Sequence, residues 1–221
     1  GAESTRSGFT DVEEDAQIKT LLPVIDFIKN NYKIPISIDT RSSKVAMAFE
    51  EHDINFINDV SSGFHDSNML DTVSKLGCSF IMTHMPREHK EGKVKEFDNI
   101  VAEISSYFIE RIESCKKAGI ETEKLIIDPG VGFGKSGEDN ITLLNNIESL
   151  KQVHKNVCIG SSNKRYSSRL FENIQTKEDL RVANLVTFAT STLSYATYLR
   201  VHDVELTKDT VQVISKAMSL T

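Results

Sequence analysis

The chain alternates short apolar, β-branched runs with longer segments in which apolar residues recur every three or four positions. The short runs predict buried strands, and the longer segments predict helices that bury one face. Strict alternation of the two is typical of a parallel sheet with helical crossovers. Six strands are expected, at residues 34–40, 54–60, 79–85, 124–130, 156–162 and 197–203. Helices are expected at residues 15–32, 43–52, 68–77, 97–119, 140–150, 180–196 and 208–220.

Each expected strand ends, at its carboxyl edge, on a hydrogen-bonding side chain. In a (β/α)₈ barrel all of these ends would surround one active-site mouth, whereas in an open doubly wound sheet only those near the reversal of strand order would meet. Asp and Asn also occur at strand ends as turn formers and helix caps, but six strands in succession favour a shared site. The residues are Asp39, Asn58, His84, Asp128, Ser162 with Lys164, and Arg200 with His202.

The first residues, GAESTRSGF, have the character of a loop that leaves a strand, and no apolar run precedes them. A complete barrel has about 250 residues. We therefore expect a (β/α)₈ TIM barrel with the first βα unit and most of the second strand absent from this chain. The polar residues 86–99 are expected to form a mobile loop over one end of the sheet. No linker is visible, so residues 1–221 are expected to form one partial barrel domain.

Composition narrows the class of protein. The 221 residues are 39% hydrophobic and 26% charged, which is typical of a globular domain. The net charge of -6 argues against a nucleic-acid partner. Cys78, Cys115 and Cys158 form no CxxC pair, so a disulfide framework or a structural zinc site is not indicated. The scattered cysteines favour a reducing compartment, so a cytoplasmic protein is expected, or a mitochondrial one in a eukaryote. No membrane partner is expected, because no apolar run reaches about 18 residues.

The segment 124–140, KLIIDPGVGFGKSGEDN, resembles a phosphate-binding loop at first sight. A Walker loop would need glycine at position 129, which is Pro129. The segment does not match the dinucleotide-binding fingerprint either, because that pattern has two residues before its third glycine, whereas one residue separates Gly132 from Gly134. The segment therefore indicates a buried strand that ends on Asp128, followed by a glycine loop that allows close approach to the backbone.

Several motifs together, in order and spacing, resemble the dihydropteroate synthase family across residues 1–221. They are GAESTRSG, ISIDT, INDVSSG, THM, IIDPGVGFGK, SSNKRY and RVHDV. The resemblance implies a folate-pathway transferase on a (β/α)₈ barrel. Such an enzyme joins 6-hydroxymethyl-7,8-dihydropterin pyrophosphate to p-aminobenzoate, and it releases pyrophosphate and 7,8-dihydropteroate.

The resemblance also implies partners beyond the two substrates. Family members use Mg²⁺ on the pyrophosphate, held partly by an asparagine on the first strand, which we expect to lie outside this chain. No metal ligand is therefore named. The family commonly forms homodimers through its last helices, and some members are fused to other folate-pathway domains.

The pterin ring needs groups that complement its edge, where amino and ring N–H donors lie beside a carbonyl acceptor. A buried carboxylate suits the donors, and an amide or ammonium suits the acceptor. We expect Asp128 to bind the donor edge, Asn58 and Lys164 to complete the pocket, and Asp39 to bond another ring nitrogen.

Breaking the bond to pyrophosphate leaves negative charge that cations must stabilise. Arg200 and His202 lie two positions apart on one strand, so their side chains share a face. Thr5 and Arg6 lie on the first loop. We expect these four residues to bind the pyrophosphate, and Arg200, His202 and Lys164 to form the catalytic set.

The amine of p-aminobenzoate is already a usable nucleophile, so no Ser or Cys nucleophile is required. Phe133 is expected to flank the benzoate ring, and Arg165 offers a cation to its carboxylate. By resemblance, Thr5 and Ser7 border the same subsite.

The chain departs from the family pattern at several positions, and one departure is that Tyr195 and its neighbours replace small residues expected before the last strand. Asn163 replaces an arginine, Thr83 replaces a methionine, and Ser7 stands where proline is common. Two other functions stay open for this reason. A methyltetrahydrofolate-type methyltransferase would share Asp39, Asn58 and Asp128 but would not need the pyrophosphate cations. The second alternative is a non-catalytic barrel within a fused folate protein.

Overall fold

The protein is described by a computed structural model of residues 1–162 and 176–219. The strands are β1 (Ser37–Asp39), β2 (Phe56–Asp59), β3 (Ser79–Thr83), β4 (Leu125–Asp128), β5 (Cys158–Ile159) and β6 (Tyr198–Leu199). The helices that precede β4 are α1 (Glu14–Asn31), α2 (Ser43–Met47), η1 (Glu50–His52), α3 (Met69–Leu76), α4 (Arg87–Lys90), α5 (Ile100–Lys117) and η2 (Thr122–Lys124). Those that follow it are α6 (Gly137–Asn145), α7 (Ile147–Val153), α9 (Lys177–Leu193) and α10 (Val204–Met218).

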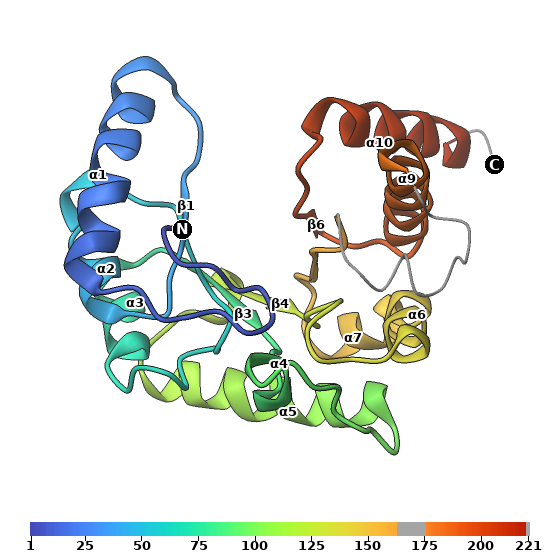
Figure 1. The fold of residues 1–221 in the computed structure, drawn as a ribbon, viewed down its shortest axis with the longest axis horizontal. Helices are drawn as coiled ribbons and strands as arrows, with labels where there is room; N and C mark the ends of the chain where they lie inside the picture. The colour runs from blue at the N-terminus through green and yellow to red at the C-terminus, as the bar shows by residue number, and fades with distance from the viewer. Residues whose placement is uncertain (163–175, 220–221) are drawn as a thin grey trace.

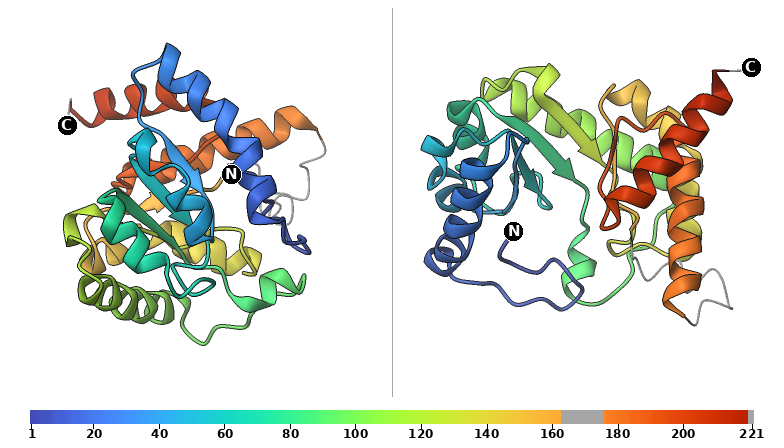
Figure 2. Two further views of the ribbon diagram at one scale, coloured as in Figure 1. Left: turned by 90° about the vertical axis from the view of Figure 1, so that its left-hand side faces the viewer. Right: turned by 90° about the horizontal axis from the view of Figure 1, so that it is seen from above.

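The strands lie side by side in sequence order, and every pair is parallel. β1 to β4 form one sheet, β5 pairs with β6, and a parallel bridge between Ile127 and Val157 connects the two groups. The strands form an inner wall with the helices outside it (Figures 1 and 2). Sequential order without a reversal is the arrangement of a (β/α)₈ barrel and differs from a doubly wound sheet. The predicted barrel architecture is therefore confirmed for the part of the chain that the structure describes.

The two faces of the wall bury different residues because strand side chains alternate. The large core lies between the strands and the helices, and Ile38, Ile57 and Ile127 belong to it. A smaller cluster of Ile81, Ile126 and Cys158, with Phe56 packed against it, lies on the opposite face. That face is the barrel interior, and the polar residues two positions further along each strand share it.

Helix α5 shows how a helix attaches to this wall. Its buried residues include Ile104, Phe108, Ile112 and Cys115, which recur every three or four positions and form one apolar stripe. The Asn99 side chain caps its first turn by accepting a hydrogen bond from the Ala102 amide at 3.1 Å.

All six predicted strands are present, but three predicted segments differ in detail. Residues 43–52 were expected to form one helix, yet the chain forms α2 and the separate 3-10 helix η1. Residues 140–150 were expected to form one helix, yet the chain forms α6 and α7, which meet at Asn146. Residues 86–99 contain the short helix α4. Among the described helices, none has the length and apolar character needed to cross a membrane.

Candidate active site at the strand ends

Residue alternation brings the polar strand ends together on the interior face. Asp39 pairs in register with Asn58, and Thr83 pairs with Asp128. Side chains at even spacing on a strand face the same side of the sheet, and so do residues that pair in register on adjacent strands. By one or the other criterion, each of these residues faces the barrel interior. Arg200 follows β6 directly and reaches both Asp128 and Asp39. The structure therefore assembles Asp39, Asn58, Asp128 and Arg200 as the sequence predicts.

Asp128 is the buried centre of this group, with no solvent exposure. Its Oδ1 accepts a hydrogen bond from the Gly130 amide at 2.8 Å, and its Oδ2 accepts one from Arg200 Nη2 at 3.1 Å. Arg200 Nη1 lies 3.9 Å from Asp39 Oδ2. The guanidinium fits here because residue 160 is glycine, where a Cβ would lie only 2.7 Å from Arg200 Nη2. Burial has the largest single effect on Arg200 and opposes its charge, but the contributions of Asp128, Cys158 and Asp39 together outweigh it and raise the Arg200 pKa.

Asn58 and Thr83 are buried on the same face without hydrogen-bond partners. Asn58 is 3% exposed, and both its Oδ1 and Nδ2 lack a partner among the described residues. Thr83 is fully buried, and its Oγ1 lacks one as well. Buried polar atoms without partners are rare in folded proteins, and they indicate a position that a ligand completes.

The prediction that His84 lies at the shared mouth is wrong. Its ring packs edge-on against Tyr107 of α5, with 4.9 Å between ring centroids, on the helix side of the wall. His84 directly follows Thr83, so alternation turns its side chain to the opposite face. Burial in this position lowers the His84 pKa well below its ordinary value of 6.5. Thr83, which the sequence analysis noted only as a departure, occupies the interior position.

The glycine loop after β4 is held from inside by Lys135. Its ammonium donates to the carbonyl oxygens of Gly130 at 2.9 Å, His84 at 3.0 Å and Phe133 at 3.2 Å. The side chain is 4% exposed. The Gly-Lys-Ser sequence therefore ties the loop to the end of β3. Gly130 has a φ of 69°, and a Cβ there would lie 2.1 Å from the His84 carbonyl oxygen, so this close approach requires glycine.

His89 of α4 joins the first loop of the chain to the glycine loop. Its Nε2 lies 3.1 Å from the Thr5 carbonyl oxygen, and its Nδ1 accepts from the Gly134 amide at 3.1 Å. The Phe133 ring packs edge-on against His89 at 4.9 Å and is 4% exposed. Phe133 thus supports the loop from within in this structure.

The first loop carries the predicted anion residues Thr5 and Arg6. Arg6 is exposed, and it has no ion pair within residues 1–162 and 176–219. Ser7 lies beside the turn after α4, where its Oγ would be 3.5 Å from a Cβ at Gly92. The structure does not bring Arg6 into contact with Arg200.

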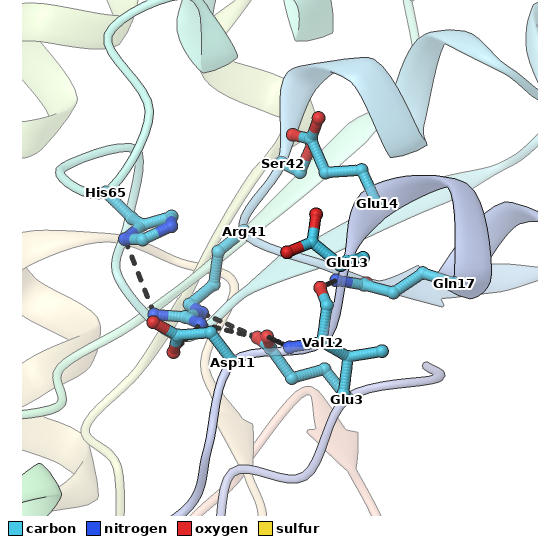
Figure 3. Close-up of a pocket in the computed structure, with 9 residues that line it drawn as sticks. All are labelled: Glu3, Asp11, Val12, Glu13, Glu14, Gln17, Arg41, Ser42 and His65. Atoms are coloured by element: carbon cyan, nitrogen blue, oxygen red, sulfur yellow. Dashed lines mark hydrogen bonds and ion pairs between the residues drawn. The ribbon is translucent and has the colours of Figure 1, made fainter.

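Arg41, which the sequence analysis missed, fixes the base of this loop (Figure 3). Arg41 Nη2 lies 2.6 Å from Glu3 Oε2 and 3.1 Å from Asp11 Oδ1, and both Arg41 and Glu3 are almost buried. Lys90 Nζ binds Asp11 from the other side at 2.8 Å. Arg41 and Lys90 also lie over the Phe9 ring, at 5.0 and 5.1 Å from its centroid. We call Arg41, Glu3, Asp11, Lys90 and Phe9 the loop clamp.

A pocket of about 240 Å³ borders the loop clamp and is lined by Glu13, Glu14 and Gln17 of the α1 start, among others. It contains none of the predicted pterin residues. Its carboxylates surround an arginine that they already neutralise, so the pocket offers no free cation to an anionic substrate.

His202 is exposed beyond β6, and its Nδ1 lies 2.9 Å from Ser162 Oγ at the end of β5. The predicted residues Lys164 and Arg165, together with Asn163, lie outside the described residues. Their place in the site stays a prediction.

The site holds no activated nucleophile among the described residues. Cys158 faces the interior, but burial, reinforced by the Asp128 charge, raises the pKa of its thiol, which is therefore protonated at neutral pH. In the described ranges no three or more His, Cys, Asp or Glu side chains are grouped so as to hold a metal ion. The arrangement instead offers a buried acceptor, an adjacent cation and unpaired polar atoms, which suits a flat polar heterocycle bearing an anion.

Comparison with known proteins agrees with this chemistry. The signature of the family described as pterin binding enzyme matches residues 1–202. Dihydropteroate synthase of Escherichia coli strain K12 is 30% identical over 220 residues, covering 99% of this chain and 77% of that protein. A solved Xanthomonas albilineans dihydropteroate synthase with 4-aminobenzoic acid superposes with a TM-score of 0.92 at 32% identity, covering 100% of this chain and 78% of that one. The same organism's enzyme in complex with 7,8-dihydropteroate gives 0.88 at 30% identity, covering 96% and 80%.

Proposed function

The chain belongs to the pterin-binding enzyme family, and on that premise we propose that it catalyses the dihydropteroate synthase reaction of folate biosynthesis. In this reaction 6-hydroxymethyl-7,8-dihydropterin pyrophosphate and p-aminobenzoate give 7,8-dihydropteroate and pyrophosphate. One observation carries the proposal. A fully buried carboxylate, Asp128, lies 3.1 Å from a guanidinium, Arg200, on the interior face of the barrel.

Asp128 has the position and chemistry to bind the pterin. Its Oδ2 accepts from the planar N–H donors of Arg200 in this structure. The amino group and adjacent ring N–H of a pterin form a similar planar donor pair, so the ring edge replaces the guanidinium on this carboxylate. Asn58, with an unpaired donor and an unpaired acceptor, binds the ring beside it, and Asp39 and Lys164 complete the pocket.

The cations stabilise the leaving group. Cleavage of the C–O bond moves the bonding electron pair onto pyrophosphate and leaves positive charge on the pterin methylene. Arg200, displaced from Asp128, and His202, both of which follow β6, meet the developing negative charge. Thr5 and Arg6 of the first loop, and Lys164, are proposed to contribute further contacts to the pyrophosphate.

The aromatic amine completes the substitution. Its nitrogen lone pair forms the new C–N bond at the methylene, and the nitrogen then loses a proton. Thr5, Ser7, Phe133 and Arg165 are proposed to surround the benzoate. The protein supplies orientation and charge stabilisation, because no covalent intermediate is needed.

Mg²⁺ on the pyrophosphate is proposed from the family resemblance. The described residues do not form a metal site by themselves. Magnesium bound through substrate phosphates needs few protein ligands, but no residue of this chain is named as one and no step is routed through the ion. A homodimer, a fusion to other folate-pathway domains and a cytoplasmic location are proposed on the same basis.

The test is pyrophosphate release from 6-hydroxymethyl-7,8-dihydropterin pyrophosphate, measured with and without p-aminobenzoate. Release that depends on p-aminobenzoate, with 7,8-dihydropteroate formed in equal amount, is expected. Pterin binding without release would favour a methyltransferase-type barrel, and absence of pterin binding would favour a non-catalytic module. Either result would overturn the proposal.

A further inference from the structure

The Thr83 hydroxyl is a buried group without a structural role in the described chain. Two buried threonines elsewhere in the described chain satisfy their hydroxyls within their own helices. Thr187 Oγ1 in α9 donates to the Ala183 carbonyl at 2.9 Å, and Thr207 Oγ1 in α10 donates to the Asp203 carbonyl at 2.6 Å. Thr83 Oγ1 has no hydrogen-bond partner among residues 1–162 and 176–219, although the residue is fully buried. A valine would fill the same volume without an unsatisfied hydroxyl.

The backbone of Thr83 has a structural role in the sheet, whereas its side-chain hydroxyl has none that the described residues explain. Ser62 Oγ donates to the Thr83 carbonyl oxygen at 3.0 Å, so the neighbouring hydroxyl bonds the main chain and leaves Oγ1 free. β3 itself is held on both sides, by β2 and by β4. The fold therefore does not require a hydroxyl at this position.

Thr83 lies beside the proposed pterin ligands. It pairs in register with Asp128 on the adjacent strand, and it lies two positions after Ile81, which pairs with Asn58. Ile81 belongs to the interior cluster, so Thr83 shares that face. Its unpaired hydroxyl thus lies between a buried carboxylate and a buried amide that also lacks partners.

We propose that Thr83 is a specificity-determining residue that hydrogen-bonds the edge of the bound heterocycle. A hydroxyl donates to a carbonyl and accepts from an N–H. With Asp128 on the N–H donors of the ring, the Thr83 hydroxyl donates to the ring acceptor that borders them. The ligand class is a planar heterocycle with a carbonyl adjacent to an N–H and an exocyclic amine. This inference rests on the proposed pterin-binding function and adds one ligand to it.

The test compares Thr83→Val, which keeps the shape, with Thr83→Ser, which keeps the hydroxyl. Calorimetry with 6-hydroxymethylpterin is expected to show a loss of about 2- to 10-fold for Thr83→Val, the range for one neutral hydrogen bond. Thr83→Ser should stay close to the parent chain. Affinity for inorganic pyrophosphate should be unchanged in both. Without ligand, the Tm of Thr83→Val should equal or exceed that of the parent, because a buried unpaired hydroxyl has been removed.

Thr187→Val is the matched control, since it removes a buried threonine hydroxyl from α9 and should leave pterin affinity unchanged. Equal pterin affinity for Thr83→Val and the parent chain would overturn this inference and leave the proposed function standing. A fall in Tm together with equal losses for pterin and pyrophosphate would also overturn it, because Thr83 would then be structural. If the parent chain itself fails to bind the pterin, the proposed function fails first.

Discussion

Arg200 and Asp128 form an ion pair across the interior of the barrel, with Nη2 3.1 Å from Oδ2. The other oxygen of Asp128 is engaged by the Gly130 amide. The same Oδ2 therefore serves Arg200 in this structure and the pterin edge in the proposed complex. In the proposed complex, pterin binding would break this charge-assisted contact and free Arg200 to reach the pyrophosphate.

Arg200→Ala should weaken binding of the pyrophosphate part of the substrate much more than binding of the pterin part. Affinity for pyrophosphate and for the pyrophosphorylated pterin should fall roughly 10- to 100-fold, as expected when a charge-assisted contact of about 1.5–3 kcal/mol is lost. Affinity for the bare hydroxymethylpterin should fall much less, because that ligand has no pyrophosphate for Arg200 to contact. Calorimetry with the three ligands measures this. Equal losses for all three would show that Arg200 supports only the pocket or the fold.

Asp128→Asn should be the most damaging change in the pterin pocket. The amide presents a donor where the pterin presents donors, and it removes the charge that holds Arg200. Pterin affinity should fall roughly 10- to 100-fold, the scale of a charged hydrogen bond. Pterin titration, with circular dichroism to verify folding, measures this. Unchanged affinity in a folded variant would refute the assignment of Asp128.

The loop clamp permits a paired test of the first loop. Arg41→Met leaves the nearly buried Glu3 carboxylate without its partner, and unpaired buried charges of this kind cost about 3–5 kcal/mol. Lys90→Met removes the exposed contact to Asp11, which is worth about 0–1 kcal/mol, together with the contact of Lys90 to the Phe9 ring, and it leaves no buried charge unpaired. Hydrogen exchange of residues 2–12 should accelerate strongly in the first variant and little in the second. Similar exchange in both would contradict the distinct role of Arg41.

His84 should make stability depend on pH. Burial lowers its pKa in the folded chain well below 6.5, so the unfolded chain binds more protons below about pH 6.5. The free energy of unfolding should therefore fall with decreasing pH there, by up to about 1.4 kcal/mol per pH unit from this group. His84→Gln should flatten that slope between about pH 5 and 6.5. The chain has no tryptophan, so urea unfolding followed by circular dichroism is the measurement. Parallel slopes in both chains would refute this role.

Strand positions could be predicted because apolar runs and helical periods are local properties of the sequence. Asp39, Asn58 and Asp128 could be placed as well, since each ends a strand whose interior residues are recognisable. His84 was misplaced because the strand end was identified from residue type alone. Thr83 lies two positions after Ile81, so the two side chains share a face of β3. To identify that face as the interior one from the sequence, the inward-facing positions of the neighbouring strands would also have been needed.

The roles of Arg41 and Lys135 could not be predicted in the same way. Both are charged residues next to glycine, serine or threonine, a context typical of solvated loops. Arg41 is buried because Glu3, 38 positions earlier, meets it. Lys135 is buried because three carbonyl groups converge on its ammonium. Such partners come from segments that only the folded chain brings together.

The burial of Lys135 gives the glycine loop a chemical reporter. An amine-reactive reagent can modify this ammonium only after its three carbonyl contacts separate and the loop that carries Gly130 moves away from His84. Surface lysines such as Lys44 and Lys75, more than half exposed, react without any such opening. The rate of acylation of Lys135 therefore reports how often the loop beside Asp128 opens. A ligand that closes the barrel mouth would lower this rate.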